Sequence, residues 1–218
     1  MQKRRLYLLL IGVGVVVALF AFLGQSQEPE YGGKRLSEWV ERLPWTPEDK
    51  PSEAEDAIRS IGTNGIPYFL AWIAYEPPLW RQWWYYYIGG GHAASKREIR
   101  ANKSWLAFRG LGEQAAEGVP ELTRLLNDTH GWTGSLYALE ALTVLGKTGL
   151  PGLVAGLTNQ DRLMRKSIAD RLLNMGTNAL PAVPALANVL KDPDVAVREA
   201  ATNALREIDP KALERATR

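Results

Sequence analysis

The chain has 218 residues, of which 46% are hydrophobic, which is enough apolar material for one domain with a core of ordinary size. It contains no cysteine, which excludes disulfides, thiolate nucleophiles and cysteine-based metal sites. Without Lys3, Arg4 and Arg5, the net charge of +2 disappears, because 23 basic and 24 acidic residues remain. A body without net positive charge does not neutralise phosphates, so we expect no nucleic-acid partner.

The N-terminal region consists of a basic head, residues 1–5, and an uncharged apolar run, residues 6–23. As a helix this run spans about 27 Å, close to the ~30 Å hydrocarbon core of a bilayer. The sequence therefore predicts a single-pass transmembrane anchor, with the head in the cytoplasm and the body on the other side of the membrane. The alternative is a signal peptide cleaved near Ser26, which would leave a secreted body. The polar residues 24–33 are predicted to form a tether.

The rest of the chain repeats a pattern in which glycine ends one helix and proline opens the next. Proline follows glycine by five residues at Gly62/Pro67, Gly146/Pro151 and Gly176/Pro181, and by eight at Gly112/Pro120. Glycine adopts the conformation required after a last helical turn at little cost, and proline is tolerated in a first turn. Within each unit a short polar turn joins two helices, and Asp161 and Asp194 are each expected to cap the helix that follows such a turn.

The predicted body is therefore all-α and is built from about five antiparallel helix pairs, because apolar residues recur at helical spacing between these turns. The pairs are 34–43 with 52–61, 64–75 with 95–111, 114–127 with 133–145, 149–158 with 161–175, and 178–190 with 194–207, followed by a short terminal helix over 210–217. The small residues Ala200, Ala201 and Ala204 would let neighbouring helices approach closely.

The segment LKDPDVAVREAATNAL, which begins at Leu190, resembles HEAT repeats, as do the glycine–proline copies. The opening YGGKRLSEWVERL, Tyr31 to Leu43, is similar to the start of bacterial membrane-anchored HEAT-repeat proteins. The resemblance implies a right-handed α-solenoid over residues 34–218 that acts as a protein-interaction scaffold. The family has no common catalytic residue, so the resemblance implies no active site.

An aromatic insertion, residues 76–95, interrupts the second helix pair at a turn that the later pairs complete in a few residues. Trp, Tyr and Arg dominate binding hot spots, and insertions on one face of a repeat array often bind partners. The predicted partner-binding residues are Trp80, Arg81, Trp83, Trp84, Tyr85, Tyr86 and Tyr87 of the insertion and Lys96, Arg100 and Lys103 of the next helix.

Other interpretations of the same residues stay open. The insertion could pack over the N-terminal repeats, because large aromatic side chains contribute most to cores. Residues 80–87 could instead bind a small ligand or the lipid interface, where Trp and Tyr are favoured. The basic stripe Lys96, Arg100 and Lys103 could be an ordinary solvated helix face.

Catalytic motifs are missing from the sequence. The stretch GGGHAASK lacks the Gly-Lys-Ser/Thr ending of a phosphate-binding loop. A remote alternative is an enzyme that uses His92 or His130, but neither histidine has a second histidine or a cysteine near it in sequence. We therefore expect no enzymatic activity, no catalytic residue, and no bound metal or cofactor.

Overall fold

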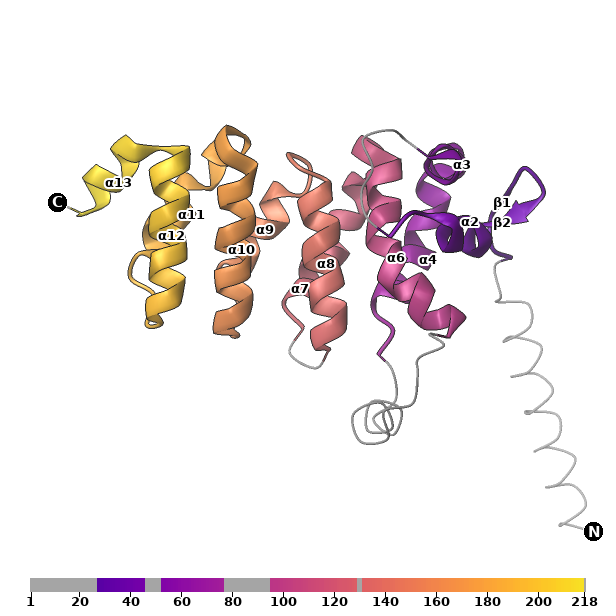
Figure 1. Ribbon diagram of the computed structural model, residues 1–218, viewed down its shortest axis with the longest axis horizontal. Coiled ribbons are helices and arrows are strands. Elements are labelled where there is room, and N and C mark those ends of the chain that lie inside the picture. The colour runs from indigo at the N-terminus through magenta and orange to yellow at the C-terminus, as the bar shows by residue number, and fades with distance from the viewer. Residues whose placement is uncertain (1–26, 46–51, 77–94, 129–130, 218) are drawn as a thin grey trace, which may run out of the picture.

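The computed structural model describes residues 27–45, 52–76, 95–128 and 131–217, and its elements are helical except for one short hairpin (Figure 1). The elements are β1 (Glu30–Tyr31), β2 (Lys34–Arg35), α2 (Leu36–Arg42), α3 (Glu53–Ile61), η1 (Gly62–Gly65), α4 (Ile66–Ile73), α6 (Lys96–Leu111), η2 (Gly112–Gly118), α7 (Val119–Leu126), α8 (Trp132–Val144), α9 (Leu150–Gly156), α10 (Arg162–Met175), η3 (Gly176–Ala182), α11 (Val183–Val189), α12 (Val195–Ile208) and α13 (Pro210–Thr217).

The helices stack one pair after another along the long axis, from α2 and α3 at one end to α13 at the other (Figure 1). Long helices α6, α8, α10 and α12 alternate in sequence with short helices α4, α7, α9 and α11. The predicted all-α class is confirmed, and the stacking agrees with a solenoid. The right-handed sense of the superhelix stays a prediction.

The connections between repeats follow the predicted glycine–proline pattern, with one correction. Gly62, Gly112, Gly146 and Gly176 each follow a helix and have φ values between 54° and 67°. The proline in the first turn of α11 is Pro184, and the predicted Pro181 instead lies inside η3. The spacing from glycine to the helix-opening proline therefore alternates between five and eight residues, because η2 and η3 are each seven residues long, whereas η1 has only four and Gly146 lies in a short turn.

Side-chain caps fix where several helices begin. Ser52 and Ser95 form capping boxes with Glu55 and Glu98, three residues later. The predicted caps are confirmed, because the Asp161 carboxylate accepts a hydrogen bond from the Leu163 amide, and Asp194 does the same for Ala196 and Val197.

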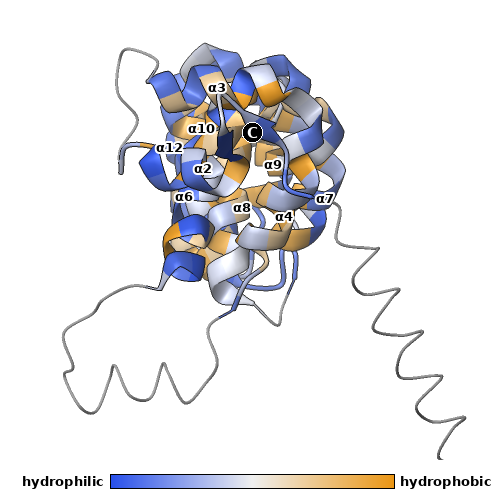
Figure 2. Ribbon diagram, turned by 90° about the vertical axis from the view of Figure 1, so that its right-hand side faces the viewer, coloured by the Kyte–Doolittle hydropathy of each residue, from blue (hydrophilic) through white to orange (hydrophobic). Residues whose placement is uncertain are grey.

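One continuous core runs between the two layers of helices. Viewed along the long axis, hydrophobic positions gather toward the inside and hydrophilic positions cover the outer turns (Figure 2). The predicted small residues Ala200, Ala201 and Ala204 are all buried. They let α12 pack against α10, in the most extensive helix–helix contact among the described elements.

The N-terminal end departs from a regular repeat. Strands β1 and β2 form a two-residue antiparallel hairpin that the sequence did not predict. Helix α2 packs on both α3 and the long helix α6. Lys103 of α6 lies under the end of α2, where its ammonium group donates to the carbonyl oxygens of Glu41 and Leu43 at 2.8 and 2.6 Å.

Several predictions fall on residues outside the described ranges. They concern the anchor 6–23, residues 24–26 of the tether, the aromatic insertion between Glu76 and Ser95, and both histidines, His92 and His130. The remaining tether residues, 27–33, include β1 and are hydrogen-bonded to the body, because the Trp39 indole donates to the Tyr31 carbonyl oxygen and the Tyr68 hydroxyl donates to that of Gln27. Within the described ranges, no helix is both long enough and apolar enough to cross a membrane.

Candidate functional site

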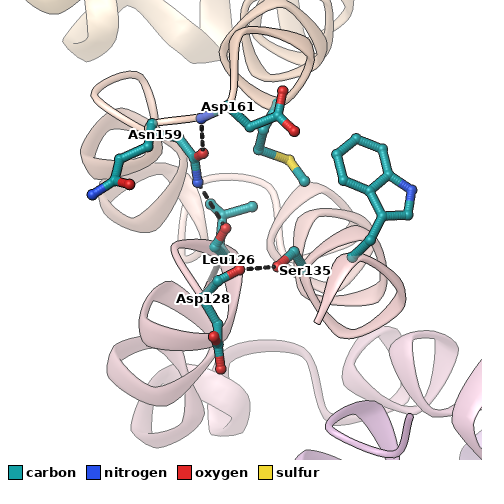
Figure 3. Close-up of a pocket in the computed structure, with 8 residues that line it drawn as sticks. Leu126, Asp128, Ser135, Asn159 and Asp161 are labelled. Carbon is teal, nitrogen blue, oxygen red and sulfur yellow. Dashed lines mark hydrogen bonds between the residues drawn. The ribbon is translucent and has the colours of Figure 1, made fainter. Parts of the chain in front are cut away.

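A pocket of about 320 Å³ opens between α8 and α10, at the edge of the molecule where the long helices begin (Figure 3). Its lining combines apolar side chains with polar and acidic ones. The lining residues are Leu126, Asp128, Trp132, Ser135, Asn159, Gln160, Asp161 and Met164.

The pocket exists because the long helices separate at this interface. The extensive contact between α10 and α12 has no counterpart between α8 and α10. The short helix α9 packs tightly instead: a Cβ added at Gly156 would lie 2.6 Å from Leu126 and 2.7 Å from Ile168. At this interface the short helices therefore pack closely while the long helices lie apart. An ion pair between Arg171 and Glu140 bridges α8 and α10.

The closed interface shows what fills the equivalent space in the next repeat. The Arg165 guanidinium of α10 reaches Asp192, with Nε–Oδ2 and Nη2–Oδ1 distances of 2.7 and 2.8 Å. It also donates to the carbonyl oxygens of Asn159 and Gln160 in the turn that precedes α10. The hydrogen bonds from Arg165 lower the pKa of Asp192, and Asp192 raises the pKa of Arg165.

The same positions hold neutral residues at the pocket. Counted from the helix N-caps Gly131 and Asp161, Ser135 occupies the place of Arg165. The Ser135 hydroxyl lies within 3.0 Å of the carbonyl oxygens of Leu125, Asp128 and Gly131, but this side chain is too short to cross to the next repeat. Asn159 occupies the place of Asp192, and its side chain bonds to the Leu126 carbonyl and the Asp161 amide (Figure 3). Replacement of a long cation by serine thus leaves the space empty.

The pocket rim combines an indole with a carboxylate. Trp132 is 52% exposed although it is a large apolar residue. One oxygen of Asp161 caps α10, and the other accepts no hydrogen bond from any described residue. The Asp128 carboxylate points away from Asp161 (Figure 3), and Arg124 lies 4.0 Å from it.

Residue 76, where the aromatic insertion begins, lies close to this pocket. The N-cap of α8, Gly131, has no side chain, and the Glu76 carboxylate accepts a 2.9 Å hydrogen bond from the Gly134 amide instead. A Cβ at Gly131 would lie 2.9 Å from Glu76, so glycine permits this approach. The insertion is thereby joined at its first residue to the helix that carries Trp132.

The predicted basic stripe splits into three different environments. Lys96 is exposed. Arg100 pairs with Glu41 of α2 at 2.8 Å. Lys103 is only 5% exposed, and burial lowers its pKa. The interpretation as a uniformly solvated face is therefore wrong at Lys103, which holds the end of α2 in place, and the structure brings Arg100 and Lys103 together for packing within the chain.

The remaining predicted site residues, Trp80, Arg81, Trp83, Trp84, Tyr85, Tyr86 and Tyr87, lie outside the described residues, and their role stays a prediction. No described group of three or more histidine, aspartate or glutamate side chains is arranged to hold a metal ion.

The family model of the HEAT repeat matches residues 182–211, which include α11, α12, the turn between them and the start of α13. The chain carries a HEAT repeat. The resemblance inferred from the segment at Leu190 is thus confirmed over this repeat. Among solved structures, the crystal structure of an engineered protein is similar, with 20% identity over 84% of this chain and 76% of that chain, and a TM-score of 0.43. No curated protein matches the sequence.

The pocket was missed at the sequence level, although a signal for it exists. The sequences of α10 and α12 both place arginine four residues after a capping aspartate, at Arg165 and Arg198. In α8 the fourth residue after the N-cap Gly131 is Ser135 instead. The absence of a long side chain at this position marks the interface that opens.

Proposed function

We propose that this chain is a non-enzymatic protein-interaction scaffold that is tethered to a membrane. The observation that carries the proposal is a row of exposed apolar side chains along the edge where the long helices begin. Trp132 and Leu136 lie on α8, Leu163 on α10 and Val195 on α12, and each is at least 36% exposed. Because three successive repeats contribute to the row, one extended partner would contact several repeats at once.

The HEAT repeat supports this proposal, because stacked helix pairs present long surfaces for binding other proteins. The edge with the exposed row is also the edge that bears the insertion, since Glu76 contacts the first turn of α8. Elaboration of a repeat array at one face is typical of a binding face.

Tethering through residues 6–23 completes the proposal. Residues 1–5 would stay in the cytoplasm and the solenoid would lie on the other side, joined by residues 24–33. The proposal rests on the length of the apolar run and the basic residues before it. Mass analysis of the mature N-terminus distinguishes an intact anchor from cleavage near Ser26, and protease treatment of oriented membrane vesicles reports the side on which the body lies.

Photo-crosslinking tests the binding edge. A photoreactive phenylalanine analogue replaces Leu163 in the full-length chain, which is then irradiated in its native membranes. Leu180 in η3 is the matched control, because it is 49% exposed against 48% for Leu163 but lies beyond the opposite end of α10, roughly 20 Å away. We expect a discrete crosslinked adduct from position 163 and none from position 180. Adducts from both positions, or from neither, would contradict the proposed edge.

A further inference from the structure

The pocket between α8 and α10 has the chemistry of a site for a cation. Its eight described lining residues include two carboxylates and an indole but no lysine or arginine. An indole face attracts cations through the ring quadrupole, most strongly when the cation is partly desolvated. Asp161 supplies the negative charge at the rim, with one oxygen that accepts no hydrogen bond from a described residue, although the nearby Arg165 also interacts with this carboxylate through its charge.

The N-terminal ends of two helices lie at the pocket, but they oppose the binding of a cation only weakly. Helix N-termini favour anions, and both α8 and α10 begin at the pocket. Each N-terminus already has its own carboxylate, however: Asp161 caps α10, and Glu76 accepts from the Gly134 amide of α8. An anion in the pocket would therefore face the Asp161 carboxylate at the start of α10, whereas a cation would meet it as a partner. The start of α8 is already occupied by Glu76, which does not line the pocket.

The neighbouring interface shows which cation fits. There a guanidinium from Arg165 occupies the space between two repeats and donates to turn carbonyl oxygens as well as to a carboxylate. The pocket offers the same kinds of acceptors, because the carbonyl oxygens of Leu125, Asp128 and Gly131 lie beside Ser135 and the Asp161 carboxylate lies at the rim. A planar guanidinium can also stack on an indole while it donates in its own plane, which an ammonium group cannot do.

We propose that this pocket receives an arginine side chain of the protein partner, in the place that the chain's own arginine fills at the next interface. This inference rests on the proposed scaffold function. The guanidinium would stack on Trp132, donate to the open oxygen of Asp161, and reach the turn carbonyl oxygens around Ser135. The volume of about 320 Å³ is at the small end of the range for ligand pockets, which suits a single side chain.

Titration with a minimal ligand tests the inference. The probe is N-acetyl-arginine N-methylamide, added to the full-length chain in detergent micelles and followed by NMR at the backbone amides of Ser135 and Met164. N-acetyl-citrulline N-methylamide, which has the same shape but no charge, is the control ligand. We expect saturable shifts with a Kd on the order of 1 mM for the arginine compound and none for citrulline. Equal binding of the two compounds, or no binding of either, would overturn the inference.

Matched variants locate the binding. Asp161→Asn keeps the helix cap and removes the charge, so we expect roughly tenfold weaker binding. Asp194→Asn makes the same change at the N-cap of α12 and should leave Kd unchanged. Trp132→Ala should weaken binding about fivefold, whereas Val195→Ala, at the same position of α12, should not. Equal effects of Asp161→Asn and Asp194→Asn would contradict a site at this pocket.

The photo-crosslinking experiment and the arginine titration can give negative results independently of each other. Crosslinks from position 163 without arginine binding would leave the scaffold standing and remove this pocket as its arginine site. Arginine binding without any crosslink would contradict the scaffold, and with it the assignment of the arginine to a protein partner.

Discussion

Two successive interfaces of the array, α8 with α10 and α10 with α12, are built from the same kind of helix pair. They differ in whether the short helices or the long helices make the closer contact. In the second, Arg165 and Asp192 join the repeats and the long helices pack along their lengths. In the first, Ser135 and Asn159 stand at those positions, the long helices separate and a pocket opens.

The short helices show the complementary difference. Helix α9 with the residue after it reads LPGLVAGL, and α11 with the residue after it reads VPALANVL, so Gly152 and Gly156 of α9 become Ala185 and Val189 of α11. The two glycines let α9 lie close to Thr123, Leu126 and Leu142. A few positions per repeat therefore decide whether an interface closes through its short or its long helices, without any change in the order of elements.

The largest effect is expected from Gly156→Val, which places in α9 the residue that α11 has at the same position. The added side chain would collide with Leu126 and Ile168, and such overpacking costs about 3 kcal/mol. Urea denaturation followed by circular dichroism measures the loss of unfolding free energy. Val189→Ala in α11, which creates space instead, serves as the comparison and should cost about 1 kcal/mol. A smaller loss for Gly156→Val than for Val189→Ala would show that α9 is not tightly packed.

The next effect concerns the closed interface. Arg165→Ala removes both bonds to Asp192, whose side chain is only 8% exposed, and leaves that carboxylate without its main partner. We expect a loss of about 2 kcal/mol in the same denaturation assay. Arg124→Ala is the control, because its pair with Glu121 is largely exposed, and it should cost clearly less than Arg165→Ala. Similar losses for both variants would mean that the interface pair adds nothing beyond a surface ion pair.

A double-mutant cycle sharpens the comparison by converting the open interface toward the closed one. Ser135→Arg and Asn159→Asp together supply the pair that Arg165 and Asp192 form in the next repeat. We expect each single variant to be destabilising and the two changes to be coupled favourably by about 1 kcal/mol. The double variant should also lose binding of the arginine compound, because its own side chain fills the pocket. Strict additivity of the two changes would contradict the equivalence of the positions.

The smallest effect is the pH dependence of the closed interface. The pKa of Asp192 is lowered in the folded chain, chiefly by its hydrogen bonds from Arg165. Its stabilising contribution is therefore complete above the unfolded pKa of about 3.9 and is lost as the pH falls through the lower folded pKa. The stability difference between the wild type and Asp192→Asn should be constant from pH 7 to about pH 5 and shrink in more acidic solution. A difference that grows on acidification would contradict this sign.

Much of the helical framework could be predicted from the sequence, because glycine, proline and capping aspartates mark helix ends through local chemistry. Gly62, Gly112, Gly146 and Gly176 end helices as predicted, and Asp161 and Asp194 begin them. The choice of Pro181 over Pro184 was wrong, because both prolines follow Gly176 and the spacing to the next helix depends on the length of the 3-10 segment, which is seven residues in η3 and four in η1.

The tertiary features could not be predicted in the same way. A lysine at helical spacing from other basic residues looks solvated, and nothing local to Lys103 reports that α2 folds over it. The cap that Glu76 provides for α8 joins residues 58 positions apart. Of these features, only the pocket has a signal in the sequence, because Ser135 stands where α10 and α12 have an arginine. That signal becomes visible when the repeats of α8, α10 and α12 are aligned, instead of those of α10 and α12 alone.

The contact between Glu76 and the first turn of α8 couples two parts of the protein mechanically. The chain leaves that carboxylate directly for the aromatic insertion, while Trp132, two residues before Gly134, lines the pocket. A displacement of the chain at Glu76 would therefore disturb the first turn of α8, beside the wall of the pocket. Binding of one molecule to the insertion would then change the affinity of the pocket for another molecule, and the reverse.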